Sequence, residues 1–395
     1  MRIFDPQEAG MDADRLERAL ELIRRNAADR TEKFAYPGAV TLIIRRGLPV
    51  AYEACGYRSL EPEKVPMTVD TIFDMASITK PVATTSAFLR LLEMGEVLLE
   101  DPVSKYLPEF DAPMKDCITL FHLLTHTSGL PASVAIYLHG STREDAVRSL
   151  FSLHLIHRPG ERVLYSCMGF IILGLIIEKV TGSDLGTFVR QEVFEPLGMT
   201  ETGFFTVEEC HDRSRIAPTE KRGGGSNGAG ILEWMKRSGK FLDRHSSNGI
   251  ACGAVHDENA LAMGGISGNA GLFSTAADIG RFALMYRNSG AMDGKMIFSP
   301  STISLATHNH TIGLGENRGI GWQLKTPGAS SSFGNLMSAQ AYGHTGFTGT
   351  GLWIDPVLDL IVILLTNRVH PSRTNERLME LRPRFVNAVV AAIEP

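Results

Sequence analysis

The chain has 395 residues, of which 44% are hydrophobic and 21% charged, as expected for a folded protein with a large core. Because 39 Lys and Arg face 44 Asp and Glu, the formal net charge is −5 and no basic run stands out, which argues against a nucleic-acid partner. No apolar run reaches the roughly 18 residues that a membrane span requires, so no membrane span is expected.

The five cysteines are spread over the chain without any C-x-x-C pair; they are Cys55, Cys117, Cys167, Cys210 and Cys252. An odd, scattered set indicates free thiols in a reducing compartment rather than a disulfide framework or a zinc site. The first residues also lack an apolar signal core. We therefore expect a cytoplasmic protein, although a secreted form without its leader would look similar.

The N-terminal third begins with an amphipathic helix over residues 11–27 and continues as a hairpin, with strands at 38–50 and 50–57. From Ser77 onward helices dominate. The expected helices lie at residues 119–126, 142–153, 166–180, 184–193, 257–263 and 275–287. A second hairpin, with strands at 350–354 and 360–366, precedes a last helix at 377–393.

Strands at both ends of the chain, with helices between them, predict one sheet built from both termini. The expected class is α+β, with an α/β sandwich domain formed by residues 1–75 and 265–395 and a mainly helical domain formed by residues 76–264. Residues 201–263 contain a Gly-rich run and are expected to be a long surface excursion whose role the pattern does not define.

The chemistry of the chain is indicated first by Ser77 and Lys80, a Ser-x-x-Lys pair at the start of an apolar helical segment that ends at Gly95. Residues three apart on a helix lie on one face, roughly 5–6 Å between Cβ atoms, so hydroxyl and amine can meet. A serine hydroxyl needs a neighbouring base, and a lysine is one only if its pKa falls towards neutrality. We therefore expect a lowered pKa at Lys80, and the helix start as an oxyanion site.

Two further stretches make the pair specific: Tyr165-Ser166-Cys167 just before a helix, and His344-Thr345-Gly346 before the C-terminal hairpin. Ser-x-x-Lys, a Ser-Asp-Asn-type element and Lys-Thr-Gly form the motif set of serine β-lactamases and penicillin-binding proteins. In order and rough spacing, the chain resembles class C β-lactamases, DD-peptidases and family VIII carboxylesterases from about residue 38 to its end. Residues 71–80, 123–130, 270–275 and 349–367 support the resemblance.

The resemblance implies a β-lactamase/transpeptidase-like fold and a role for each motif residue. Ser77 would be the nucleophile that forms an acyl-enzyme, Lys80 would hold or accept its proton, and Tyr165 would share the base work and protonate the leaving group. The backbone N–H groups of Ser77 and Phe347 would form the oxyanion hole, the latter following an edge strand. His344 would line the site and assist when protonated, beside Thr345 and Gly346 at the substrate. No cofactor or metal is implied.

Two positions depart from the family pattern. Cys167 stands where an asparagine usually binds the substrate amide, and a thiol is a poor hydrogen-bond donor. His344 stands where a lysine is usual, and a mostly neutral imidazole attracts a carboxylate less well. Both changes favour a carboxylesterase acting on small acyl esters over a class C-like β-lactamase or D-amino-acid peptidase. A penicillin-binding sensor with little turnover is an alternative of another class, although Tyr165 is present.

Two histidines and two arginines outside the three motifs are further candidates for a functional role. His122 and His126 lie four apart on an expected helix, but no third ligand is apparent, so both are expected to be structural rather than metal-binding. Arg318 and Arg368 are possible binders of a substrate carboxylate. The substrate is expected to be a small ester, a peptide or a β-lactam, and the sequence leaves its identity and the oligomeric state open.

Overall fold

The fold is taken from a computed structural model that describes residues 1–395 except 111–113, 205–213, 222–227, 239–248, 329–331 and 395. Its main sheet has seven antiparallel strands in the order β3-β2-β1-β12-β11-β10-β9. The strands are β3 (Val65–Pro66), β2 (Leu48–Ser59), β1 (Gly38–Arg45), β12 (Leu360–Thr366), β11 (Gly351–Asp355), β10 (Tyr342–Thr345) and β9 (Gln323–Leu324). The pairing of β1 with β12 places both ends of the chain in one sheet.

Alternating side chains of the central strands supply two separate cores, because successive strand residues point to opposite faces. In β1, Val40 and Leu42 belong to the larger core, whereas Ala39 and Ile43 belong to the smaller one. Strand β12 is fully buried along its length, as a strand covered on both faces should be. The sheet is therefore the middle layer of a three-layer region.

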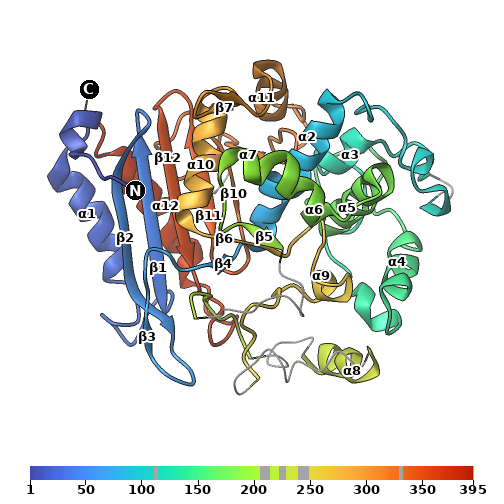
Figure 1. The fold of residues 1–395 in the computed structure, drawn as a ribbon, viewed down its shortest axis with the longest axis horizontal. Coiled ribbons are helices and arrows are strands. Elements are labelled where there is room, and N and C mark those ends of the chain that lie inside the picture. Colours follow the sequence, from blue (N-terminus) through green and yellow to red (C-terminus); the bar gives the residue numbers. More distant parts are fainter. Residues whose placement is uncertain (111–113, 205–213, 222–227, 239–248, 329–331, 395) are drawn as a thin grey trace.

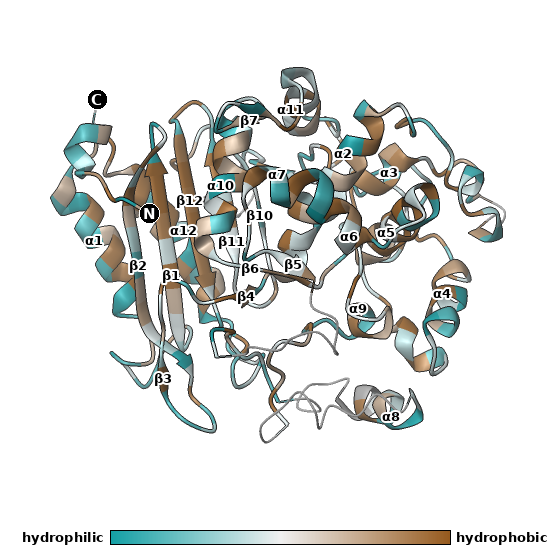
Figure 2. Cartoon of the chain, viewed as in Figure 1, coloured by the Kyte–Doolittle hydropathy of each residue, from teal (hydrophilic) through white to brown (hydrophobic). Residues whose placement is uncertain are grey.

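Helices cover both faces of this sheet (Figure 1). Helices α1 (Ala13–Arg24) and α12 (Arg377–Val390) pack against each other and bury the smaller core on one face. Helix α10 (Ala276–Arg287) packs on β1 and β12 from the other face. Colouring by hydropathy shows the strands between them as mainly hydrophobic and α1 as mixed (Figure 2).

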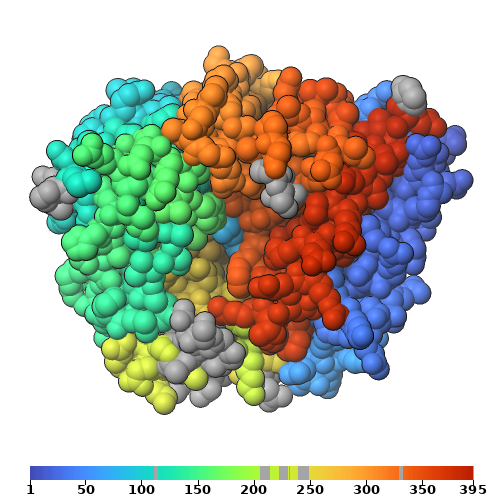
Figure 3. Space-filling view, turned by 180° about the vertical axis from the view of Figure 1, so that it is seen from behind, coloured from blue at the N-terminus to red at the C-terminus, as the bar shows by residue number. Residues whose placement is uncertain are grey.

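The remaining helices form a second region beside α10, and its core is continuous with the larger core of the sheet. They are α2 (Ser86–Glu93), α3 (Leu120–Leu124), α4 (Arg143–Phe151), α5 (Cys167–Thr181), α6 (Leu185–Val189), α7 (Glu195–Leu197), α8 (Gly228–Ser238), α9 (Glu258–Ala262) and α11 (Pro300–Thr307). Two small sheets complete the fold: β4 (Phe73–Asp74) with β6 (Leu272–Ser274) and β5 (Gly203–Phe204), and β7 (Ala291–Met292) with β8 (Lys295–Met296). From behind, the helical region and the C-terminal part of the sheet region meet along a furrow (Figure 3).

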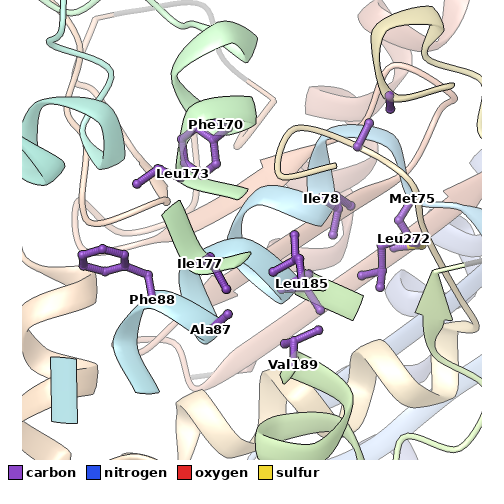
Figure 4. Close-up of a cluster of buried hydrophobic side chains, with 14 of the residues drawn as sticks. Met75, Ile78, Ala87, Phe88, Phe170, Leu173, Ile177, Leu185, Val189 and Leu272 are labelled. Carbon is purple, nitrogen blue, oxygen red and sulfur yellow. The ribbon is translucent and has the colours of Figure 1, made fainter. Parts of the chain in front are cut away.

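A dense apolar cluster lies under the segment that carries Ser77 (Figure 4). Met75 and Ile78 flank the serine and are fully buried, and Phe170 and Ile177 of α5 belong to the same core. Because close-packed side chains leave little room for displacement, this cluster fixes the position of the backbone around Ser77.

The α+β class and both hairpins are confirmed, and so are the helices at each end of the chain. Helices α8 and α11 were not predicted; α8 lies in the expected excursion, part of which falls outside the described residues. The boundaries of the two proposed domains stay a prediction. Where the chain is described, the cysteines are free thiols, and no helix has both the length and the apolar character needed to cross a bilayer.

Candidate active site

Ser77 lies in a 3₁₀ turn (Ala76–Ile78) that follows β4, and Lys80 begins a π-helical turn (Lys80–Thr85) that runs into α2. The expected continuous α-helix is thus replaced by two irregular turns. Ala76 adopts a left-handed conformation with φ of 47°, and Asp74 accepts a hydrogen bond from its N–H at 2.8 Å. The backbone is therefore held in an uncommon bend immediately before Ser77, where it turns the serine towards the lysine.

The Lys80 side chain is completely buried and donates from Nζ to three acceptors. These are the Asn269 carbonyl at 2.9 Å, Ser77 Oγ at 3.1 Å and Cys167 Sγ at 3.5 Å. Three acceptors satisfy the three N–H donors of an ammonium group. Lys80 therefore joins the serine turn, the N-terminus of α5 and the loop before β6.

The expectation that the pKa of Lys80 falls towards neutrality is wrong. Burial lowers the pKa of the amine, but Cys167 and Tyr165 raise it, and the balance lies above its ordinary value. The physical reason is that the Cys167 and Tyr165 side chains favour the charged form by more than burial disfavours it. At neutral pH Lys80 is therefore an ammonium that orients Ser77.

Tyr165 is brought to this ammonium by His126, a residue of the loop after α3. The His126 carbonyl accepts from Leu164 N–H at 2.8 Å, and its Nδ1 accepts from Ser166 N–H at 3.0 Å. Its ring also lies 4.6 Å from the ring of Tyr165, centroid to centroid. His126 thus holds the backbone on both sides of Tyr165 and packs on the tyrosine itself.

The Tyr165 ring lies 5.0 Å from Lys80 Nζ. Burial raises the pKa of the phenol, whereas the Lys80 ammonium and Ser77 lower it, and the net pKa lies above the ordinary value. The phenol is therefore neutral at rest. A cation this close stabilises the phenolate more than the phenol, so the lysine reduces the free-energy cost of removing the proton.

His344 lies beside Tyr165, with the two ring centroids 5.9 Å apart. Its Nδ1 faces the Thr345 carbonyl at 2.9 Å, so this nitrogen carries the proton and Nε2 is an acceptor, buried without a partner. Burial lowers the pKa of His344 well below its usual range, and Lys80 and Arg318 lower it further. The expectation that a protonated His344 assists the reaction is therefore corrected: its imidazole is neutral.

Thr345, Gly346 and Phe347 form the end of β10 and the loop after it, and hydrogen bonds tie this loop to the serine turn. Thr348 and Thr350 donate to the carbonyls of Asp74 at 2.7 Å and Met75 at 3.0 Å. A side chain at Gly346 would meet the Met75 carbonyl at 2.5 Å from its Cβ, which explains the glycine. The loop that carries Phe347 is therefore held against the serine turn.

The two backbone N–H groups of the predicted oxyanion hole, those of Ser77 and Phe347, lie on these two connected loops. The oxyanion hole itself stays a prediction. In the described residues, neither group is used in the bonds that tie the two loops together. The prediction that this loop follows an edge strand is wrong, because β9 pairs with β10. That pairing covers only Tyr342 and Gly343, so His344 and Thr345 still project past it.

Both the sequence and the fold of the chain are similar to those of known proteins. The sequence profile described as Beta-lactamase matches residues 23–382. The chain belongs to the beta-lactamase family. It is a serine hydrolase of the superfamily that contains β-lactamases and penicillin-binding proteins.

This serine hydrolase is similar in sequence to two relatives and similar in fold to one solved structure. It is 31% identical over 386 residues to the "Putative D-alanyl-D-alanine carboxypeptidase" of Escherichia coli (strain K12), covering 92% of this chain and 85% of the relative. It is also 31% identical over 392 residues to the N-acetylmuramyl-L-alanine amidase of Bacillus subtilis (strain 168), covering 93% and 84%. Its fold is similar to that of the hydrolase EstCE1, with a TM-score of 0.71, 23% identity and coverage of 95% and 99%.

The fold of this family member brings three further groups to the motif residues, in roles that the sequence did not predict. Asn269 offers its carbonyl to Lys80, His126 holds Tyr165, and Arg318 lies over the Tyr165 ring. A carbonyl carries no residue-type signal, so Asn269 was not identifiable. His126 was expected to be structural because it lies in a stretch that carries the family resemblance, and its hydrogen bonds to the backbone beside Tyr165 are of that kind.

Proposed function

We propose that the protein hydrolyses small acyl esters through an acyl-enzyme on Ser77. The observation that carries this proposal is the 3.1 Å contact between Ser77 Oγ and Nζ of the fully buried Lys80, with the Tyr165 ring 5.0 Å from the same ammonium. A nucleophile, a fixed cation and a phenol within reach of one another are the parts that acyl transfer needs.

In the proposed reaction, Ser77 Oγ attacks the ester carbonyl and its proton passes to Tyr165, which reacts as the phenolate. The Lys80 ammonium stabilises that phenolate and keeps Ser77 Oγ oriented. The oxyanion of the tetrahedral intermediate is held by the N–H groups of Ser77 and Phe347. Tyr165 then gives the proton to the leaving alcohol, and in the second half it takes one from the water that hydrolyses the acyl-enzyme.

The preference for esters rests on Cys167 and His344. The thiol of Cys167 already accepts from Lys80 and is a weak donor towards a substrate amide. The neutral His344 offers no positive charge to a substrate carboxylate. An ester needs neither contact. It has no amide N–H to be bound, and its alcohol is a better leaving group than an amine.

A second candidate is hydrolysis of an amide bond in cell-wall peptides, which the two curated relatives favour because both names denote amide cleavage. The alignments with these relatives extend over more than nine-tenths of the chain. A cytoplasmic address remains part of this proposal and rests on the scattered free thiols; such an address would suit the recycling of cell-wall fragments.

The proposal is tested by offering p-nitrophenyl acetate, a chromogenic cephalosporin and a peptide ending in D-alanyl-D-alanine to the wild type. Continuous release of p-nitrophenol, absent from the Ser77→Ala variant, is the expected result. Faster turnover of the peptide or the cephalosporin would instead favour the second candidate or a β-lactamase. An initial burst with no further turnover would contradict hydrolysis and indicate a sensor.

Replacing Cys167 by asparagine should raise the ratio of cephalosporin to ester turnover by about tenfold, because one good hydrogen bond to a substrate amide is worth about 1.5 kcal/mol. The matched control is Cys252→Asn, at a half-buried thiol that donates to the Ile216 carbonyl and does not contact Lys80. An unchanged ratio in Cys167→Asn would show that this position does not set the choice between ester and amide.

A further inference from the structure

Arg318 lies over the ring of Tyr165 from a loop outside the three motifs. Its guanidinium carbon is 5.4 Å from the ring centroid, and the residue is only 4% exposed. The backbone is fixed on both sides, because its N–H donates to Thr311 Oγ1 and its carbonyl accepts from His310 N–H, each at 2.8 Å. The cation is therefore held in place rather than free to swing towards solvent.

One carboxylate faces this cation. Arg318 Nη2 donates to Glu316 Oε2 at 2.8 Å, and Glu316 is also bound by the Gln323 amide at 2.6 Å. Arg318 Nε is buried and has no hydrogen-bond partner among the residues that the structure describes. The guanidinium is thus only partly satisfied by Glu316, and the rest of it lies against the aromatic ring.

The other groups around Tyr165 come from four elements. Lys80 supplies a second positive charge, Cys167 supplies a thiol, and two histidines, His126 and His344, lie at 4.6 and 5.9 Å between ring centroids. Burial lowers the pKa of both histidines well below the ordinary value, with Arg318 and Lys80 adding to the effect. Lys80 and Arg318 are therefore the cations that face the phenol in the described residues.

We propose that Arg318 is a positioning residue that polarises Tyr165, supplying from the loop before β9 the positive charge that the neutral His344 cannot supply. The inference rests on the proposed function, because it takes Tyr165 as the base. Arg318 favours the phenolate by charge, because its guanidinium carbon lies 5.4 Å from the ring centroid and the cation is almost entirely shielded from solvent. Glu316 offsets part of that charge and so limits the effect.

The test reads the proton on Tyr165 directly. Tyrosine labelled with ¹³C at Cζ reports phenol and phenolate by its chemical shift, and the Tyr165→Phe variant assigns the signal. In Arg318→Gln, the midpoint of this titration is expected to rise by about one pH unit, and kcat/KM for the ester should fall about tenfold near neutral pH. Arg318→Lys should restore most of the midpoint, and Glu316→Gln should move it the other way.

Controls separate charge from folding. Arg190→Gln removes an exposed arginine paired with Glu195 and should change neither readout. An unmoved midpoint in Arg318→Gln, or a midpoint in Arg318→Lys that follows Arg318→Gln, overturns the inference. If circular dichroism shows that Arg318→Gln does not fold, the test is made with Glu316→Gln instead. An unchanged Tyr165 titration midpoint in Glu316→Gln would then contradict the inference. Loss of ester turnover in Tyr165→Phe is judged separately and tests only the proposed base.

Discussion

Replacing Lys80 by methionine is expected to lower kcat/KM for p-nitrophenyl acetate roughly 10²- to 10³-fold, as loss of one group that stabilises developing charge does elsewhere. Methionine fills nearly the same space but cannot donate to Ser77 Oγ, Cys167 Sγ or the Asn269 carbonyl. Nor can it stabilise a phenolate at Tyr165. Because an apolar side chain is well tolerated in a buried pocket, the melting temperature should change far less than the rate.

Lys115→Met is the matched control, because Lys115 is a second buried lysine that donates to the Phe151 carbonyl in the helical region and lies over the Phe110 ring. It should retain wild-type turnover. Steady-state kinetics and thermal unfolding of both variants make the comparison. Turnover of Lys80→Met within tenfold of the wild type would remove Lys80 from the chemistry.

Replacing Tyr165 by phenylalanine should cost about 10³-fold in kcat/KM and should also change the pH profile. In the proposed mechanism the reacting form is the phenolate, and burial raises the pKa of this phenol above its ordinary value near 10. Below that pKa the phenolate fraction grows about tenfold per pH unit, so wild-type kcat/KM should climb from neutral into alkaline solution. Without the phenol, this slope should disappear.

The pH profile is measured with a substrate whose own alkaline hydrolysis is subtracted. Tyr286→Phe serves as control, since Tyr286 is a buried tyrosine of α10 outside the site, and it should keep the wild-type slope. A profile that falls from neutral to alkaline pH in the wild type would mean that the reacting base is already deprotonated at neutrality. Such a result would exclude Tyr165 as the base.

Much of the fold was predictable because its signals are local. The apolar, partly β-branched run from Ala39 to Ile44 identifies β1, and Ser166 before an apolar run marks the start of α5, where its hydroxyl caps Gly169 N–H. The three motifs were likewise readable in order and spacing. Their meeting in space is what the fold adds, since nothing local places Lys80 beside residue 167.

What the sequence could not give depends on long-range packing. Burial and the positive end of a helix predict a lowered pKa for Lys80, whereas Cys167 and Tyr165, which come from a distant segment, raise it. The charge of His344 depends on Lys80 and Arg318, which are remote in sequence. The short strand β9 has only two residues, too few for any periodic signal, yet it removes β10 from the edge of the sheet.

The most direct measurement of the central idea is to quench the protein during turnover of an acyl ester and map the attached acyl group by peptide mass spectrometry. We expect one acyl group on the peptide that contains Ser77, absent from Ser77→Ala. An acyl group found only on another residue, or none on an enzyme that is turning over substrate, would contradict an acyl-enzyme at Ser77.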